Sequence, residues 1–260
     1  MKAVILAGGL GTRLREETEF RPKPMVEVGS KPILWHIMKI LGHHGVHEFV
    51  IPIGYRGEVI KDYFVNYEAR NNDFTVHLGQ PHRIEFHNAH LESDWSVTVV
   101  DTGADTMTGG RVKQVVPFLD GERCIVTYGD GLADVDVTKL LAFHEEQGRL
   151  ATVTTVRPLS RFGVLELDES GGVARFREKP KVDGYVNAGF MVLEPAVLDD
   201  YLDYDSVLEE APLEALAKDQ QLAAYRHEGF WQPMDTYREF TMLNELWDAG
   251  DAPWKVWPDG

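Results

Sequence analysis

The chain opens with a short apolar run that leads directly into a cluster of glycines. Residues 2–7, KAVILA, have the composition of a strand buried on both faces of a parallel sheet. Gly8, Gly9 and Gly11 follow, and without Cβ atoms their backbone N–H groups can approach an anion closely. Arg13 then adds one cation, and Lys23 adds a second in a loop that prolines 22 and 24 stiffen. This order of residues predicts a triphosphate-binding loop at the end of a buried strand.

Two common glycine loops do not fit these residues. The dinucleotide fingerprint requires glycine or alanine where this chain has Leu14. The loop of the nucleotide hydrolases requires lysine and then serine or threonine after its last glycine, whereas Gly11 is followed by Thr12 and Arg13. Two interpretations of the glycine cluster remain: a turn that binds no ligand, and a different kind of phosphate-binding loop.

The full pattern is longer than a glycine loop. GGLGTR at residues 8–13, Thr18 and PKP at residues 22–24 together resemble the signature of the sugar nucleotidyltransferases, also called nucleoside-diphosphate-sugar pyrophosphorylases. The resemblance runs from Met1 to about Trp257. It implies that Arg13 and Lys23 are catalytic residues that neutralise the departing pyrophosphate and contact the α-phosphate. It also implies nucleotide contacts from Leu6, Ala7, Gly8, Gly9, Gly11 and Thr12.

Composition limits the classes of protein to which the chain can belong. With 260 residues, 43% of them apolar, the chain can bury the core of one α/β domain. No run reaches the roughly 18 to 20 apolar residues of a membrane span, and the first strand leaves no room for a signal peptide. Cys124 is the only cysteine and lies in an apolar run, so we expect a core thiol in a cytoplasmic protein.

The formal net charge of −16 argues against nucleic acid or an anionic membrane as a partner. Triphosphates and sugar phosphates are anions too, so local cations must offset the charge of the chain. We expect one positive pocket on an acidic body, formed by Arg13, Arg15, Arg21, Lys23 and Lys31.

The hydrophobic periodicity predicts a doubly wound α/β fold. Residues 31–45 carry the stripe of an amphipathic helix, residues 48–54 form a second buried strand, and residues 59–67 a second helix. This alternation predicts a Rossmann-like, mixed and mainly parallel sheet. From residue 150 the strands are short and closely spaced, which predicts a small antiparallel sugar-binding lobe. One strand is expected at 186–193, and a helix that Pro212 kinks or restarts at 208–218.

We therefore expect a single nucleotidyltransferase domain over residues 1–260. Its nucleotide-binding part spans about 1–149, its sugar-binding part about 150–235, and a C-terminal helix and tail residues 236–260.

Residues 101–111, DTGADTMTGGR, have two interpretations that the sequence alone leaves even. One is a base-recognition loop in which Thr106, Gly110 and Arg111 meet a pyrimidine, and the other is the entry to a helix. The segment is similar to the cytidine-selecting branch of the family, the glucose-1-phosphate cytidylyltransferases. The glutamine-rich segment of the thymidylyl relatives is missing here, so the resemblance favours base recognition.

Two aspartates are the candidate metal ligands. The apolar run 124–128 delivers Gly129 and Asp130 at its carboxyl end, where α/β sheets bind ligands, although Gly-Asp-Gly is also a common turn. Asp235 lies in a Trp-x-x-x-Asp-Thr setting, and either Asp235 or Thr236 could instead cap the last helix. The resemblance implies that Asp130 and Asp235 hold Mg²⁺, which prefers carboxylate and phosphate oxygens.

The resemblance also implies a sugar-phosphate site in the second half of the chain. Lys179, in an Glu-Lys-Pro motif that alone would predict an exposed turn, would be a catalytic residue that positions the sugar phosphate. The other implied contacts are Tyr128, Phe162, Gly163, Glu178 and Asn187. Histidines 82, 87 and 90 fit no ligand spacing and predict an exposed hairpin, and His144 is expected to be structural.

Together these features predict a Mg²⁺-dependent enzyme that joins CTP and α-D-glucose 1-phosphate into CDP-glucose and pyrophosphate, and that forms a homo-oligomer. The attacking phosphate oxygen is already anionic near neutral pH, so no protein nucleophile is needed. The alternatives are a thymidylyl- or uridylyltransferase, a non-catalytic subunit that senses nucleotide sugars, and a nicotinamide-dependent dehydrogenase, which Leu14 disfavours.

Overall fold

The computed structural model describes residues 1–258 except residues 10, 13, 80–82, 88–91 and 161. Its centre is an eight-stranded sheet with the order β13-β10-β14-β8-β1-β4-β7, in which β15 also pairs with β10. The strands are β1 (Lys2–Leu6), β4 (Glu48–Ile53), β7 (Ser96–Asp101), β8 (Cys124–Tyr128), β10 (Ala151–Val156), β13 (Val186–Asn187), β14 (Met191–Leu193) and β15 (Leu222–Arg226). β7, β4, β1 and β8 are parallel, whereas β14 runs antiparallel to both β8 and β10. The predicted mixed, mainly parallel sheet is confirmed.

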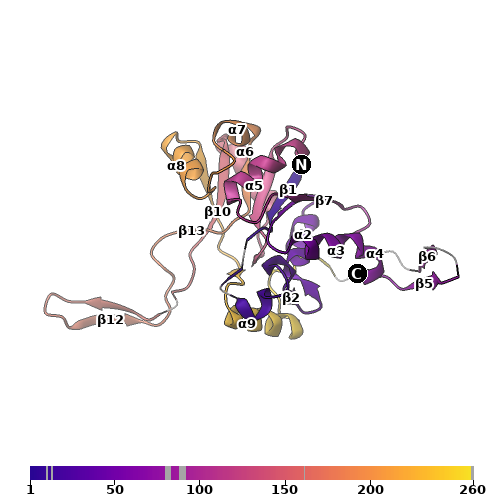
Figure 1. Cartoon of the computed structure of the whole chain (residues 1–260). Helices are drawn as coiled ribbons and strands as arrows, with labels where there is room; N and C mark the ends of the chain where they lie inside the picture. The colour runs from indigo at the N-terminus through magenta and orange to yellow at the C-terminus, as the bar shows by residue number, and fades with distance from the viewer. Residues whose placement is uncertain (10, 13, 80–82, 88–91, 161, 259–260) are drawn as a thin grey trace.

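Helices cover both faces of this sheet, as the doubly wound prediction requires. Alternate residues of β1 enter separate cores, with Ala3 and Ile5 in one and Val4 and Leu6 in the other. The first core includes residues of α2 (Ile33–His43), α3 (Gly57–Val65), α6 (Val137–Gln147) and α9 (Tyr237–Asp248). The second includes residues of α5 (Thr108–Val115), α7 (Pro195–Asp200) and α8 (Ala211–Lys218). In Figure 1, α5, α7 and α8 lie at the top, and α2, α3 and α9 lie below.

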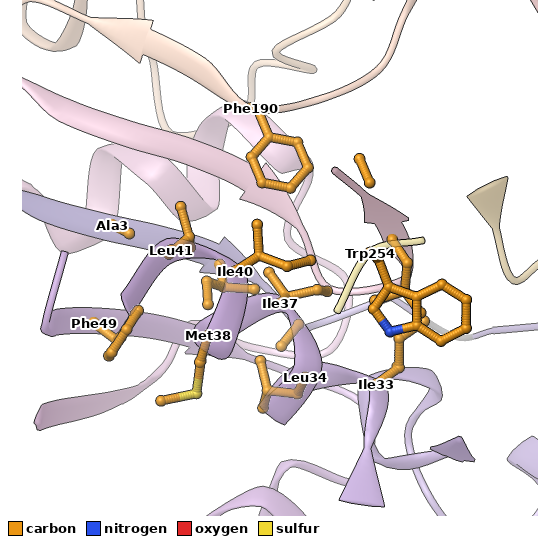
Figure 2. Packing of buried hydrophobic residues seen from close by; sticks show 14 of the residues in the cluster. Ala3, Ile33, Leu34, Ile37, Met38, Ile40, Leu41, Phe49, Phe190 and Trp254 are labelled. Atoms are coloured by element: carbon orange, nitrogen blue, oxygen red, sulfur yellow. The ribbon is translucent and has the colours of Figure 1, made fainter. Parts of the chain in front are cut away.

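The apolar stripe of α2 forms the centre of the first core. Figure 2 shows Ile33, Ile37 and Leu41 among side chains that fill the space between this helix and the sheet, where Phe49 and Phe190 also lie. The C-terminal tail packs onto the same core, because Trp254 is fully buried there and its Nε1 donates to His36 Nδ1 at 3.3 Å. The tail thus completes the core of its own chain.

Short elements connect or extend the body. They are α1 (Arg15–Thr18), η1 (Lys23–Met25), α4 (Tyr67–Asn71), η2 (Val116–Phe118), and the two-stranded pairs β2 (Glu27–Val28) with β3 (Lys31–Pro32), β5 (Phe74–His77) with β6 (Arg83–Phe86), β9 (Gly131–Ala133) with β16 (Trp231–Pro233), and β11 (Val164–Leu167) with β12 (Val173–Arg177). Figure 1 shows β5–β6 and β11–β12 projecting from opposite sides of the molecule. The expected exposed hairpin near the histidines is confirmed at His87, while residues 82 and 90 lie outside the described part.

Two expectations about the second half were wrong in detail. Residues 186–193 form two strands, β13 and β14, because Gly189 and Phe190 between them have φ values of +79° and +43° and break the extended chain. The helix expected at 208–218 is shorter: residues 208–210 form a turn and α8 begins at Ala211, so of the two alternatives at Pro212 the structure favours a helix start over a kink, with the proline in the first turn, where no N–H is needed. Within the described residues, no helix is long and apolar enough to cross a membrane.

Candidate functional site

A cavity of about 550 Å³ lies at the carboxyl edge of the parallel strands. Its walls come from the segments that follow β1, β7 and β8, and from Asp235, two residues before α9. The chain passes from β1 outward to β4 and β7 and then returns to β8 on the other side of β1. Ligands of open α/β sheets bind at such a reversal of strand order, so the topology alone favours this crevice.

The glycine loop fits tightly around one arginine. A Cβ atom on Gly8 would lie 2.1 Å from Arg111 Cζ, so this position accepts no side chain while the guanidinium stays in place. Gly11 has φ of +61° and packs against Thr18, whose hydroxyl donates to the carbonyl oxygens of Gly11 and Leu14. A Cβ on Gly9 would meet nothing within 4 Å. The loop therefore has a fixed base and an open side that lines the cavity.

Lys23 joins the two predicted metal ligands. Its Nζ lies 2.6 Å from Asp130 Oδ2 and 2.6 Å from Asp235 Oδ1, and the lysine is only 9% exposed. Burial lowers the pKa of Lys23, but the charges and hydrogen bonds of the two aspartates outweigh it and leave the pKa above its ordinary value. The structure thus brings together three side chains that are 107 and 212 residues apart in sequence.

A small ladder fixes the second aspartate beside the first. β9 follows Asp130 directly and pairs with β16, which ends just before Asp235, and Met234 N donates to Asp130 O at 2.9 Å. Thr236 caps α9 in a capping box with Glu239. The two interpretations of this segment are therefore compatible, because the threonine caps the helix while the aspartate carboxylate reaches Lys23.

Arg111 holds the base of the cavity together. Its Nη1 donates to Ile53 O, Thr102 Oγ1 and Gly103 O, and its Nη2 donates to Gly8 O and Ala104 O, at 2.6 to 3.1 Å. Burial lowers the pKa of Arg111, and the charges of Asp101 and Asp105 offset only part of this effect, so the pKa lies below its ordinary value. The guanidinium thus connects the glycine loop to the segment after β7. Both Nη atoms donate to protein acceptors. Arg111 therefore has a structural role in addition to the predicted contact with a base.

One polar group that sequence reasoning missed is Glu209. Its carboxylate accepts from Tyr128 Oη at 2.5 Å and from Thr108 Oγ1 at 2.6 Å, and Asn187 Nδ2 donates to the same Tyr128 Oη at 3.0 Å. Burial, and then the charge of Glu209, raise the pKa of Tyr128 well above its usual range. Nothing around Glu209 in the sequence marks it, because its partners are 81 and 101 residues away.

Most of the nucleotide-side predictions converge on the cavity, and several sugar-side predictions do not. The predicted residues that line it are Leu6, Ala7, Gly8, Gly9, Gly11, Thr12, Lys23, Thr106, Arg111, Tyr128, Gly129, Asp130 and Asp235. Pro24, Ala104, Asp105, Met107 and Thr108 also line it and were not named individually, although residues 104–108 belong to the predicted base-recognition segment. Gly110 is buried behind the wall, where a Cβ would lie 2.0 Å from Tyr204 O. Arg13 lies outside the described residues.

The predicted sugar-phosphate contacts are split between two places. Asn187 reaches the cavity wall through Tyr128. Phe162, Gly163, Glu178 and Lys179 flank the projecting β11–β12 hairpin, where Phe162 is 77% exposed and Lys179 Nζ lies 3.8 Å from Glu178 Oε1. A Cβ on Gly163 would lie 2.6 Å from Phe176, so this glycine packs on the hairpin itself.

Three of the five expected cations can be placed, since Arg13 and the side chain of Arg15 lie outside the described part, and these three do not share one pocket. Lys23 lines the main cavity, whereas Arg21 and Lys31 line a separate cavity beside α3 and α4. The short segment around η1 contributes to both cavities, since Lys23 and Pro24 line the main one and Arg21 and Met25 line the other.

A glycine loop at the strand reversal, with two carboxylates and a lysine facing it, is typical of an enzyme that handles nucleoside triphosphates. A sequence model described as nucleotidyl transferase matches residues 2–240, and the chain belongs to that family. It is 52% identical over 260 residues to the glucose-1-phosphate cytidylyltransferase of Salmonella typhi, covering 99% of this chain and 100% of the relative. It is also 45% identical over 267 residues to the probable glucose-1-phosphate cytidylyltransferase of Bacillus subtilis, with 99% and 100% coverage.

A solved structure shares the fold. HddC from Yersinia pseudotuberculosis, complexed with GMP-PN, superposes with a TM-score of 0.67 at 22% identity and covers 95% of this chain and 99% of that one. At this level of identity the similarity supports the fold alone. The shared fold agrees with the α/β architecture described above.

Proposed function

We propose that the protein transfers a cytidylyl group from CTP to α-D-glucose 1-phosphate and releases pyrophosphate. The observation that carries the proposal is the convergence of Lys23, Asp130 and Asp235 on the glycine-lined cavity. Membership of the nucleotidyl transferase family supports the reaction class, and the relatives from Salmonella typhi and Bacillus subtilis support the choice of substrates.

The donor set fits Mg²⁺. Asp130 and Asp235 offer hard carboxylate oxygens on one side of the cavity, and a cation, the Lys23 ammonium, already lies within 2.6 Å of each. Among the described residues no group of three or more His, Cys, Asp or Glu side chains could hold a metal. Mg²⁺ commonly binds through one or two carboxylates and completes its shell with substrate phosphates and waters, so two aspartates suffice. When bound, the ion would neutralise charge on the phosphates.

The residues of the chain then have separate tasks. The backbone of Gly8, Gly9 and Gly11 holds the triphosphate, and Lys23 places a buried positive charge next to it. Arg13 and Lys179 are proposed to neutralise the departing pyrophosphate and to position the sugar phosphate. Because the attacking phosphate oxygen is already anionic near neutral pH, alignment and charge neutralisation supply the catalysis.

Base choice is assigned to the segment between β7 and α5. Thr106, Met107 and Thr108 line the cavity there, and Arg111 holds the segment against the glycine loop. A site built for the amino group of cytosine leaves a polar partner unpaired when uracil replaces it, which costs affinity.

The proposal is tested by chromatographic measurement of nucleotide-sugar formation from glucose 1-phosphate with CTP, UTP or dTTP. We expect CTP to be preferred, Asp130→Asn and Arg13→Ala to lose about 10²- to 10³-fold in rate, and both variants to remain folded. Equal rates with all three nucleotides would defeat the base assignment. Binding of nucleotide without turnover would instead support the sensing subunit.

The same proposal includes an association between copies. Apolar side chains on the projecting β11–β12 hairpin are exposed, among them Leu165, Leu167 and Phe176 at 54%, 63% and 58%. Such surface on an isolated hairpin favours burial against another chain. We propose that the protein forms a homo-oligomer. Light scattering after size exclusion tests this association, and a monomer would contradict it.

Within each chain we propose a nucleotide-binding part at residues 1–149 and a sugar-binding part at residues 150–235.

A further inference from the structure

A second cavity, of about 330 Å³, lies on the far side of the segment that carries Lys23. Arg21 and Met25, on either side of Lys23, form one wall, and Tyr63 of α3 and Arg70 of α4 form another. Lys31 completes the lining, and Glu27 is the only carboxylate among the described residues that line it. Arg21 pairs with Glu17 and Glu27, and Arg70 pairs with Asp62, so Lys31 is the cation of this lining whose charge no ion pair of the described part offsets.

Lys31 is the centre of this site. It is half-buried, its Nζ donates to Asn71 Oδ1 and lies 5.5 Å from the centroid of the Trp35 ring, and it forms no ion pair with any residue of the described part. Burial lowers the pKa of Lys31. The charge of Glu92 raises this pKa but does not restore its ordinary value, and the charge of Lys39 lowers it further. A partly desolvated ammonium without a carboxylate partner is costly, and an anion in the cavity would remove that cost.

A second, independent observation comes from Tyr63. This tyrosine is 6% exposed and lines the cavity, and its hydroxyl has no hydrogen-bond partner within the described residues. Buried hydroxyl groups almost always have a partner, and an unpaired one costs about 1–3 kcal/mol. Lys31 thus lacks a carboxylate partner, and the enclosed hydroxyl of Tyr63 lacks a hydrogen-bond partner, in two residues that line the same cavity.

We propose that this second cavity is a binding site for a small phosphate-bearing anion, held by Lys31, Arg21 and Arg70. Its volume is within the range of small-molecule sites, and guanidinium groups suit phosphate oxygens. Arg70 pairs with the exposed Asp62 at 2.9 Å, and Arg21 pairs with Glu17 and, at 3.9 Å, with Glu27, so an anion would compete with these carboxylates for the two guanidinium groups.

Occupancy of this site acts on the main cavity through the Lys23 segment. Arg21 precedes Lys23 by two residues and Met25 follows it by two, with η1 at Lys23–Met25 between the two cavities. An anion that fixes Arg21 would fix this turn, and with it the ammonium between Asp130 and Asp235. The coupling is reciprocal, so nucleotide binding and anion binding change each other's affinity by the same factor.

The test is isothermal titration of the full chain with orthophosphate, pyrophosphate and glucose 6-phosphate at constant ionic strength, without nucleotide. We expect Lys31→Met combined with Arg70→Met to weaken one site per chain at least about tenfold. Lys218→Met, an exposed lysine at the end of α8, is the matched control and should bind as the wild type does. Preference for inorganic anions or for the sugar ester identifies the source of the ligand.

Tyr63→Phe separates binding from structure. Removal of an unpaired hydroxyl should leave the unliganded protein as stable or more stable, and should weaken the same site several-fold. Unchanged isotherms for Lys31→Met with Arg70→Met would overturn the proposal, as would an equal loss in Lys218→Met, because the latter would reflect bulk charge. The titration uses no turnover, so its failure and a failure of the proposed transferase activity are distinguishable.

Discussion

Replacement of Lys23 by methionine tests whether this side chain holds two carboxylates together. Its Nζ lies 2.6 Å from an oxygen of Asp130 and 2.6 Å from one of Asp235, so those oxygens are at most about 5 Å apart. Two unit charges at that distance repel by about 1 kcal/mol in bulk water and about 3 kcal/mol at an effective dielectric constant of about 20. Both carboxylates are less than one third exposed, at 32% and 20%, so the true value lies between these limits.

We therefore expect Lys23→Met to lower the free energy of unfolding by about 1–3 kcal/mol in a buffer that contains a chelator. Methionine keeps much of the volume of the lysine, so the loss reports mainly on charge. Denaturant titration followed by circular dichroism measures it. Adding Asp235→Asn to the variant should recover most of the loss, because one of the two repelling charges is then gone.

Magnesium gives the decisive contrast. A divalent cation can replace the missing ammonium, so Mg²⁺ should stabilise Lys23→Met more than it stabilises the wild type, with NaCl of equal ionic strength as the control. If Lys23→Met is as stable as the wild type in chelator and gains nothing from Mg²⁺, the carboxylates do not share a cation and the assigned site is wrong.

Four further substitutions test the surroundings of the cavity and the core. Gly8→Ala should destabilise the fold by about 1–3 kcal/mol because its Cβ would meet Arg111 at 2.1 Å, while Gly9→Ala, with nothing within 4 Å, should stay within about 0.5 kcal/mol by thermal denaturation. Arg111→Lys should raise the KM for the nucleotide and lower the midpoint of thermal denaturation, because an ammonium cannot donate to all five acceptors of the guanidinium. An unchanged KM would contradict this. Burial lowers the pKa of His36 to about 4, so protons bind the unfolded chain first and stability falls as the pH drops below about 6.5, by about 2 kcal/mol at pH 5. His36→Gln should lose that part of the pH dependence in denaturant titrations at pH 7 and pH 5, and a variant with the wild-type slope would refute it.

The sequence predicted those parts of the fold that depend on local pattern. The run 2–7 became β1 because continuous apolar residues suit a strand buried on both faces, as Ala3 and Val4 show by entering different cores. The stripe of α2 and the cap at Thr236 were equally readable, since helical spacing and a capping box lie within a few residues.

Interactions between distant segments were beyond a local pattern. Nothing near Glu209 announces that its carboxylate receives the hydroxyl of Tyr128, and nothing in GGR marks Arg111 as the group that packs on Gly8. The family resemblance assigned Lys23, Asp130 and Asp235 to one site, but only the pairing of β9 with β16 explains why these side chains are in contact.

The same distinction explains how an acidic chain can attract anions. The sequence predicts that neighbouring cations share one pocket, yet among those that the structure describes the fold places Lys23 in one cavity and Arg21 and Lys31 in another. In the main cavity Lys23 is outnumbered by Asp130 and Asp235, so these three groups carry a net charge of about −1 at neutral pH. They would repel a bare triphosphate and accept one that brings a divalent cation. In the second cavity Arg21 and Arg70 are already paired with carboxylates, so Lys31 supplies the charge that the proposed anion would meet without a metal. The two proposals therefore differ in kind: the first requires a metal–nucleotide complex, and the second requires a free anion.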